Sequence, residues 1–566
     1  MVWDLLMVRS LALLACFLSM VAATAPAFAA DANGYTALYE CRADGPNCNV
    51  DMEAYTTAAC AQTITVSDTL AQIEAKLNTG ADPVCVRAGD YYGKGVVTVT
   101  GDGTGGDRRV IRCATSGGAA CADPWRADSA ERARFRGLVL DNANFLILDR
   151  LAFEGTTSNT NVDVYRVDLK NGSSDIIFNR LLVEGRPTPG APIYGAFGSD
   201  GNPVSQRTIT QNSVIRENWG QTGRNCVGIG WQNGSDHWVV NNEIYNWCEH
   251  NFQNGENGTP TLSGHVLENN DIYYTPSFQG YSEDNVVFKM SGTQSGPMRV
   301  IHNRVWGTRW GTNTSENGGG LGIFLAGKGN SATDPHWVQV QNNIVFDNIY
   351  CIGGYPGQGG RNSIIGNICY NHHRFNSHGD GYSISPLYIG RDSEIYLNTI
   401  IDSDLSFYYG SANADIRCNA MISAGQVEGD AASGSGTQVG HNVYYGSANL
   451  GEATRVDKAL ATRANSTAYA SGDVMRVTGG CASSSDPACF LYKATATGTS
   501  AASAPAPCAA LGCTYADGGV AWQAIRGPYV FKRKLRTVPG GETMVIPYAV
   551  AHAGSFENNF CPGPRP

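Results

Sequence analysis

One motif recurs along the middle of the chain and constrains its fold more than any other feature. An apolar-alternating stretch leads to an asparagine, and a second short apolar stretch follows it. The copies lie 21 to 40 residues apart, so the shortest spacings give the length of one repeat and the longer ones carry loops. The stronger copies contain Asn179, Asn212, Asn242, Asn270, Asn303, Asn343, Asn367 and Asn398, and weaker copies contain Asn419 and Asn442.

The physics of this motif predicts a solenoid. Alternation with period two turns Ile, Val and Leu to one side of a strand and polar residues to the other. Asparagine tolerates left-handed backbone angles at a sharp corner, and stacked asparagine amides can hydrogen-bond to one another as a ladder. An antiparallel sandwich would instead show hairpin turns about every 8 to 12 residues. We therefore predict an all-β protein, a right-handed parallel β-helix.

The composition agrees with a repetitive, turn-rich β protein. The chain has 566 residues, of which 68 are glycine and only 16% are charged. Its net charge of -10 argues against a nucleic-acid binder. The same charge requires a locally basic groove if the partner is an anionic polymer.

The first 29 residues have the features of a signal peptide. Arg9 precedes an apolar run over residues 11–23, and residues 27–29 (Ala-Phe-Ala) give a small-x-small cleavage pattern. The run is too short to span a bilayer. We expect a secreted or periplasmic protein, with an uncleaved anchor as the alternative because Asp4 is untypical of such a segment.

Sixteen cysteines follow the predicted signal peptide. Their even number and the export signal together predict disulfide bonds. Zinc is the competing interpretation, but the sequence contains no Cys-x-x-Cys pair. The spacings predict the pairs Cys113–Cys121, Cys226–Cys248, Cys481–Cys489 and Cys508–Cys513.

Other segments frame the repeats. Residues 67–79 form a predicted helix, capped by Ser67 or Asp68 and ended by Gly80, which would cover the open end of the solenoid. After residue 450 the motif stops and the composition changes. The predicted organisation is a signal peptide at 1–29, a cysteine-containing N-terminal segment at 30–66, the β-helix at 67–450, a small β module at 451–530 and a basic tail at 531–566.

A solenoid carries function on one face, where outward side chains of successive coils align. The strands that form this face include residues 226–234, 250–258, 285–292 and 321–329. These strands and the loops before them bring acidic, basic, amide and aromatic residues together. The candidates are Trp231, Asn233, Asn254, Glu256, Tyr281, Glu283, Asp284, Lys289, Trp306, Arg309, Trp310 and Lys328.

The predicted cap helix, residues 87–106, residues 144–155 (NFLILDRLAFEG) and the asparagine ladder resemble the pectate-lyase-like superfamily of right-handed β-helices. The resemblance covers roughly residues 67–450. Within that superfamily the chain is most similar to the alginate lyase and chondroitinase B group. The resemblance implies an enzyme that cleaves an acidic polysaccharide.

Lys289 lies in an otherwise apolar strand, SEDNVVFKMSG. This strand is similar to the one that carries the base lysine in the alginate lyase and chondroitinase B group, where an upstream acidic pair helps to hold calcium. Glu283 and Asp284 lie six and five residues upstream here. The resemblance therefore implies Lys289 as the base and these two residues as calcium ligands, and we expect Glu256 to join them. A solvated lysine on an outward strand position is the alternative.

A lyase of this kind removes the proton next to a uronate carboxylate, and a cation must neutralise that carboxylate. The resemblance implies an arginine on the coil after the base. Arg309 has the right separation from Lys289, but the next strand carries Lys328, so both are candidates. The expected substrate-binding residues are Trp231, Asn233, Asn254, Tyr281, Trp306 and Trp310.

Two other functions stay open on the sequence. A hydrolase needs paired carboxylates on the binding face. Residues 371–381 (NHHRFNSHGDG) offer His372, His373, His378 and Asp380 as an acid/base group, or are an exposed polar loop. The second alternative is a non-catalytic or tailspike-like glycan-binding β-helix.

The function that we predict is an extracellular polysaccharide lyase, which cleaves a uronate-containing glycan by β-elimination. We expect an acidic polysaccharide as partner and calcium as cofactor. We expect no nucleic-acid partner, no membrane association after signal cleavage, and a monomeric protein.

Overall fold

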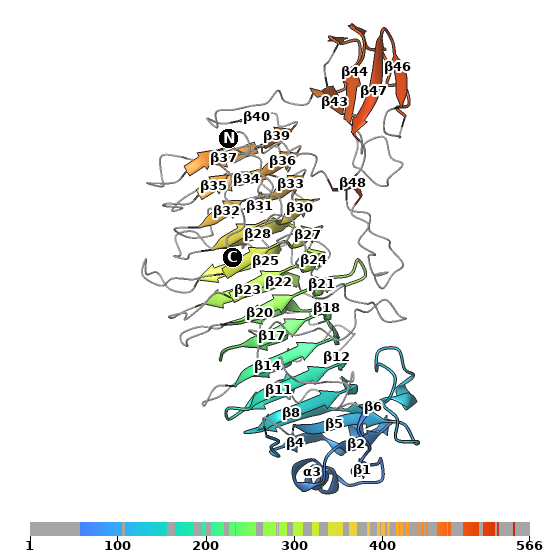
Figure 1. The fold of residues 1–566 in the computed structure, drawn as a ribbon, viewed down its shortest axis with the longest axis vertical. Helices are drawn as coiled ribbons and strands as arrows, with labels where there is room; N and C mark the ends of the chain where they lie inside the picture. Colours follow the sequence, from blue (N-terminus) through green and yellow to red (C-terminus); the bar gives the residue numbers. More distant parts are fainter. Residues whose placement is uncertain are drawn as a thin grey trace, which may run out of the picture. The chain divides into compact units, whose positions relative to one another are not determined.

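The computed structural model describes residues 57–104, 108–154, 165–185 and 195–199, most of 205–354, and shorter runs between 362 and 548. Three long sheets stack coil on coil between residues 62 and 450 (Figure 1). Each coil contributes one strand to sheet 1, then one to sheet 2 and one to sheet 3, and strands of successive coils pair in parallel. The predicted right-handed parallel β-helix is confirmed.

The 14 described strands of sheet 1 are β1 Gln62–Ile64, β2 Val84–Arg87, β5 Arg109–Ala114, β8 Asn144–Asp149, β11 Ser174–Asn179, β14 Gln206–Gln211, β17 His237–Val240, β20 Val266–Glu268, β23 Met298–Ile301, β26 Val338–Gln341, β29 Ser363–Ile365, β32 Glu394–Tyr396, β35 Asp415–Arg417 and β38 Gln438–Gly440.

The 13 described strands of sheet 2 are β3 Gly89–Asp90, β6 Ala133–Phe135, β9 Leu151–Glu154, β12 Leu182–Glu184, β15 Val214–Asn218, β18 Glu243–Trp247, β21 Asp271–Tyr273, β24 Arg304–Trp306, β27 Ile344–Phe346, β30 Ile368–Tyr370, β33 Thr399–Ile401, β36 Ala420–Ile422 and β39 Val443–Tyr445.

The 13 described strands of sheet 3 are β4 Val96–Val99, β7 Gly137–Asp141, β10 Tyr165–Lys170, β13 Gly195–Ser199, β16 Val227–Trp231, β19 Glu249–Asn254, β22 Ser282–Met290, β25 Leu321–Gly327, β28 Tyr350–Gly354, β31 Tyr382–Ile384, β34 Asp404–Phe407, β37 Gln426–Gly429 and β40 Asn449–Leu450.

The core runs through the middle of the coils, with apolar side chains from all three sheets. In the coil of β17, β18 and β19, Val239, Ile244 and Phe252 point inward and are at most 2% exposed. Burial of one such side chain contributes about 1.5–3 kcal/mol, so each coil is stable only when stacked on its neighbours.

An asparagine ladder lines the corner between sheets 1 and 2. From Asn242 to Asn398, the side-chain Nδ2 of each ladder asparagine donates to the side-chain Oδ1 of the next one at 2.9 or 3.0 Å. The seven described members are Asn242, Asn270, Asn303, Asn343, Asn367, Asn398 and Asn419.

The ladder differs from the prediction at its first two members. In the coil before Asn242, Ser213 occupies the ladder position, because its backbone N–H donates to the Asn242 side chain. Asn212 lies one residue earlier and accepts from Asn241 instead. Asn179 ends strand β11 and donates to Asp149. Asn442 lies outside the described residues.

The left-handed backbone conformation also lies one residue before the ladder position. Asn241, Asn269, His302 and Asn342 have φ between 54° and 58°, and Gly366 has φ of 69°. The corner residue and the ladder residue are therefore two different positions, each favouring asparagine for its own reason.

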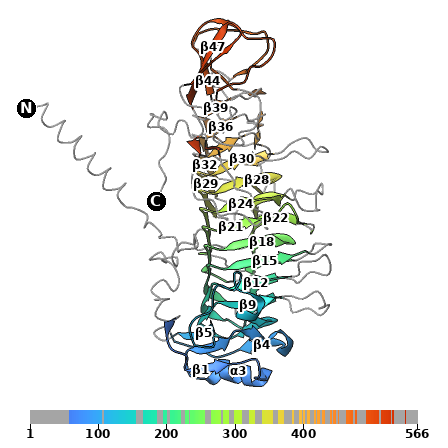
Figure 2. The same cartoon turned by 90° about the vertical axis from the view of Figure 1, so that its right-hand side faces the viewer.

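A helix lies at the start of the solenoid. Helix α3 covers Leu70–Thr79 and lies beside β1 (Figure 2). Its Ile73 and Leu77 belong to the solenoid core. Its N-cap is Thr69, which forms a capping box with Gln72, rather than the predicted Ser67 or Asp68. The helix ends at Gly80 as predicted. Two 3-10 turns follow, η1 Tyr92–Lys94 and η2 Ser129–Glu131.

The structure contains disulfide bonds at three of the predicted pairs, Cys113–Cys121, Cys226–Cys248 and Cys508–Cys513. It adds Cys60–Cys85 and Cys351–Cys369, which the sequence did not predict. The Cys351–Cys369 bond joins β28 of sheet 3 to β30 of sheet 2. The predicted pair Cys481–Cys489 lies outside the described residues.

The residues after 460 form separate, mostly antiparallel sheets. Their described core contains Tyr469, Met475, Tyr492, Val520 and Trp522. Among the described residues, no helix is long and apolar enough to cross a membrane. The strands are β41 Ala461–Thr462, β43 Val474–Arg476, β44 Leu491–Ala494, β46 Thr514–Asp517 and β47 Val520–Arg526 in one sheet, β42 Ala468–Tyr469 with β45 Gly498–Thr499 in a second, and β48 Tyr529–Val530 with β49 Pro547–Tyr548 in a third.

Candidate functional site

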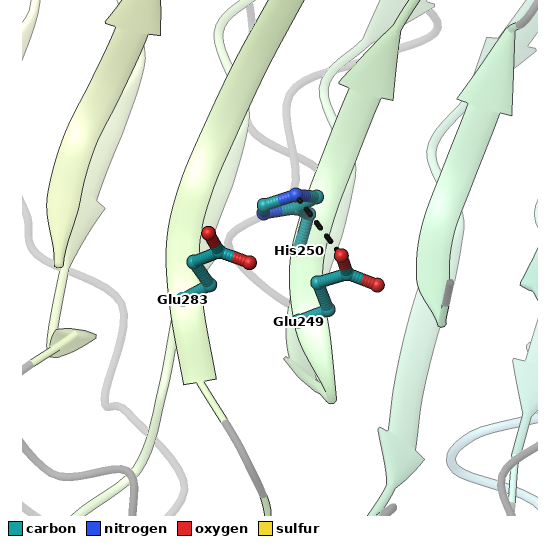
Figure 3. A group of neighbouring side chains, drawn as sticks. All are labelled: Glu249, His250 and Glu283. Carbon is teal, nitrogen blue, oxygen red and sulfur yellow. Dashed lines mark ion pairs between the residues drawn. The ribbon is translucent and has the colours of Figure 1, made fainter. Parts of the chain in front are cut away.

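Three side chains from two adjacent strands of sheet 3 converge at the starts of these strands (Figure 3). Glu249 and His250 begin β19, and Glu283 lies near the start of β22. One ligand atom from each lies within 4.8 Å of the others. Glu249 and His250 are buried, whereas Glu283 is partly exposed. We call this group the Glu-His-Glu cluster.

Glu249 is held in place from the preceding coil. Its Oε2 accepts a hydrogen bond of 3.1 Å from the backbone N–H of Cys226. Cys226 is also bonded to Cys248, the residue directly before Glu249. Glu249 has φ of 68°, a conformation that is uncommon for a non-glycine residue. The disulfide, the hydrogen bond and the backbone turn together direct the carboxylate toward His250.

His250 is oriented by the following coil. Its Nδ1 lies 3.4 Å from the backbone carbonyl oxygen of Asp284, and its Nε2 lies 3.8 Å from Oε1 of Glu249. Because a carbonyl oxygen only accepts, Nδ1 is the donor in this contact. The hydroxyl of Tyr274 donates to the carbonyl oxygens of both Glu249 and Asp284, so it ties the two strands together.

Asp284 has a structural role in the described part of the molecule. Its Oδ1 accepts from the backbone N–H groups of Gly320 at 3.1 Å and Leu321 at 2.8 Å, at the start of β25. The carboxylate therefore organises the next coil, and the prediction of Asp284 as a metal ligand is not supported by its contacts. Glu256, the third predicted ligand, lies outside the described residues.

Calcium is a poor match for this donor set. Calcium takes six to eight oxygen ligands, and one of the three converging groups is an imidazole nitrogen. Asp284 uses its Oδ1 to accept from Gly320 and Leu321. We therefore derive no catalytic step through calcium.

Lys289 lies in regular strand near the end of β22. The nine-residue strand pairs through Lys289 with Ala326 and through Met290 with Gly327 of β25. Six residues separate Glu283 from Lys289, and an extended strand rises about 3.3 Å per residue, so about 20 Å lies between them. The structure does not bring these two predicted site residues together. Five others lie outside the described residues: Asn233, Tyr281, Arg309, Trp310 and Lys328.

Trp231 is not a sugar-stacking residue. Its side chain is 0% exposed in the core, and its ring stacks on His237 at a centroid distance of 4.4 Å. Trp231 shares the phase of Ile229, which also points inward. The prediction was wrong because Trp231 lies on the same side of β16 as the inward-pointing Ile229, and the position that alternates with them is Gly230.

Asn254 is also an interior residue. It is 0% exposed and pairs in register with Trp231 on one side and Phe288 on the other, both of which are core residues. Both polar atoms of its amide have no hydrogen-bond partner within the described protein. The residue therefore cannot reach a substrate from this position.

Trp306 belongs to a stack of rings along sheet 2. It is 4% exposed and lies between Tyr273, at a centroid distance of 4.2 Å, and Phe346, at 5.3 Å. Tyr245 and Tyr370 extend the stack at its two ends. Its ring faces are covered by these neighbours, so the predicted contact with a sugar is wrong.

No protein family matches the sequence, and no curated protein matches it. Among solved structures, a mannuronic acid specific polysaccharide family 6 lyase from human gut microbiota is similar, with 14% identity, a TM-score of 0.36, and coverage of 70% of this chain and 83% of that one. The family 6 alginate lyase AlyGC shows 14% identity and a TM-score of 0.35, with 72% and 54% covered. PfbA, a surface adhesin of Streptococcus pneumoniae, shows 10% identity and a TM-score of 0.34, with 70% and 89% covered. The fold assignment rests on the strand pairing described above.

The sequence interpretation missed Glu249 and His250. The signal that could have found them is the dipeptide itself, two charged or titratable residues directly after Cys248 at the start of a strand. Their convergence depends on the left-handed backbone at Glu249, which no local pattern predicts for glutamate.

Proposed function

We propose that this protein is an extracellular polysaccharide lyase, which cleaves a uronate-containing glycan by β-elimination, with Lys289 as the base. The observation that carries the proposal is the position of Lys289 in a long, regularly paired strand of sheet 3. A catalytic group on a strand is held more rigidly than one on a loop.

Small residues flank this lysine in the neighbouring coils. Ala326 pairs with it from the following coil. In the preceding coil Asn254 pairs with Phe288, so the residue after it, Gly255, comes next to Lys289. Small neighbours leave room for a sugar residue beside the lysine.

The reaction sets a demand on the lysine. The base must be neutral to accept the proton next to the carboxylate, and an ordinary lysine with a pKa of about 10.4 is neutral about once in a thousand molecules near pH 7. This corresponds to about 4 kcal/mol. A nearby cation lowers the pKa and also stabilises the developing negative charge on the carboxylate.

We propose Arg309 or Lys328 as that cation. The Glu-His-Glu cluster carries two carboxylates and begins about 20 Å away along β22, so its side chains do not supply this cation. Lys328 follows directly on β25, whose Ala326 and Gly327 pair with Lys289 and Met290. Arg309 lies between β24 and β25 in sequence.

Export fits the proposal. The five disulfides of the described residues are typical of proteins from oxidising compartments. Together with the signal-peptide features of residues 1–29, they support action outside the cytoplasm.

The test is the ultraviolet absorbance of the unsaturated sugar that β-elimination creates, measured with alginate, pectate and chondroitin sulfate. We expect Lys289→Ala to lower the rate by at least about 100-fold, because general-base catalysis typically contributes 10²- to 10⁴-fold. Lys170→Ala is the matched control, since Lys170 also lies on a strand of sheet 3 and pairs with Asp168.

A Lys289→Ala protein that melts normally and keeps the wild-type rate would exclude Lys289 as the base. A wild-type protein that binds these polymers without producing unsaturated ends would support the alternative, a glycan-binding β-helix. Arg309→Ala and Lys328→Ala then distinguish the two candidate cations.

A further inference from the structure

The spacing of the Glu-His-Glu cluster is close to that of ligands around a common ion. Nε2 of His250 and Oε1 of Glu249 are 3.8 Å apart, which is longer than a hydrogen bond. Two ligands at about 2.0–2.2 Å from one transition-metal ion lie roughly 3–4 Å from each other. Glu283 supplies the third atom within 4.8 Å, from the neighbouring strand.

The imidazole is prepared for metal binding. A metal-binding histidine usually donates its other ring N–H to a carbonyl or carboxylate, which fixes the tautomer and the ring orientation. His250 has this arrangement, because Nδ1 faces the carbonyl oxygen of Asp284. Its Nε2 lies 3.8 Å from Oε1 of Glu249 (Figure 3), and in its deprotonated form this nitrogen can serve as a metal ligand.

The backbone around the cluster is fixed independently of any ion. The Cys226–Cys248 disulfide joins the coil of β19 to the preceding coil, and the Cys226 N–H orients Glu249. Tyr274 bridges the carbonyl oxygens of Glu249 and Asp284. Glu283 is partly exposed, so an ion can approach the cluster from solvent on this side.

We infer that the Glu-His-Glu cluster binds a divalent transition-metal ion of the zinc or manganese class, and that it selects this ion over calcium. Imidazole nitrogen suits zinc and its neighbours, whereas calcium is a hard ion that takes oxygen. The ion would join the coil of β19 to the coil of β22. This inference does not rest on the proposed lyase activity, because binding is measured without substrate.

The experiment is isothermal titration calorimetry of the full-length, chelator-treated and dialysed protein with zinc chloride and, separately, calcium chloride. We expect one zinc ion per chain and calcium affinity at least about 100-fold weaker. Loss of residues that only support a metal ligand costs about 10- to 100-fold in affinity, so His250→Gln and Glu283→Gln should each cost at least about 100-fold.

The matched control is His302→Gln. His302 faces Glu268 with the same separation of 3.8 Å between ring nitrogen and carboxylate oxygen, but among the described residues it belongs to no three-residue cluster. Zinc affinity should be unchanged in this variant. Because Glu283 is partly exposed, Glu283→Gln keeps the inference testable even where His250→Gln does not fold.

Three outcomes would overturn the inference: no zinc binding by the folded protein, calcium binding as tight as zinc, or equal losses in the cluster variants and in His302→Gln. The first would leave Glu249 and His250 as an ion pair. Lyase activity that persists in a protein without bound zinc would leave the proposed function intact.

Discussion

Two fully buried asparagines, Asn303 and Asn254, should respond to the same substitution with opposite changes in stability. Asn303 is completely hydrogen-bonded within the ladder, whereas the amide of Asn254 has no partner in the described protein. Leucine has the same γ-branched shape as asparagine but no polar atoms. The Asn303→Leu and Asn254→Leu variants therefore compare the same chemical change in two hydrogen-bonding environments.

The cost at Asn303 follows from the groups left behind. Its Oδ1 accepts from the Asn270 backbone N–H at 2.9 Å, and its Nδ2 donates to the carbonyl oxygen of Leu267 at 2.8 Å. Each buried group without a partner costs about 1–3 kcal/mol, so we expect Asn303→Leu to lower the free energy of unfolding by about 2–6 kcal/mol. At Asn254 the substitution removes an unsatisfied amide, and we expect a gain of about 1–3 kcal/mol.

Urea unfolding followed by far-ultraviolet circular dichroism measures both changes from the transition midpoints. The essential result is the opposite sign of the two shifts. If Asn254→Leu lowered the midpoint as much as Asn303→Leu, burial alone rather than hydrogen bonding would govern these positions, and the reasoning would be refuted.

Two further predictions concern pH and thiols. Burial lowers the pKa of His265 to about 4, below the usual value of about 6.5. Between these two pH values the unfolded chain binds a proton that the folded chain does not, so the free energy of unfolding should fall by up to about 3 kcal/mol as the pH drops from about 6.5 to about 4. His265→Gln should flatten this pH dependence of the unfolding midpoint. Ten of the sixteen cysteines after the signal peptide are in disulfides of the described residues, so titration of denatured, unreduced protein should find at most six free thiols; more would contradict the described pairing.

The repeat predicted the fold because its physics is local. Alternation and the corner asparagine are both readable in one coil, and stacking repeats them. The exact register is not local. Asn212 and Asn242 fit the same motif, yet Ser213 takes the ladder position next to Asn242. A slip of one residue is decided by pairing with the next coil, which a single repeat does not contain.

The errors at Trp231 and Asn254 were avoidable. Ile229 and Phe252 are the most apolar positions of their strands, and strict period two puts residues two positions later on the same inward side. Trp231 and Asn254 are those residues. Their residue types suggested a binding face. The alternation of side chains along the strand nevertheless decides which side each residue faces, whatever its type.

The Glu-His-Glu cluster could not be predicted in the same way, because it departs from alternation. Glu249 and His250 are consecutive residues, which in a regular strand would point to opposite sides. The left-handed backbone at Glu249 and the register irregularity between Glu249 and His250 bring both toward Glu283. Such an irregularity needs support from outside the strand, here the Cys226–Cys248 disulfide and the Cys226 N–H. Local departures that the surrounding structure maintains in this way are typical of functional sites, and the start of β22 is therefore as strong a candidate for function as Lys289 near its end.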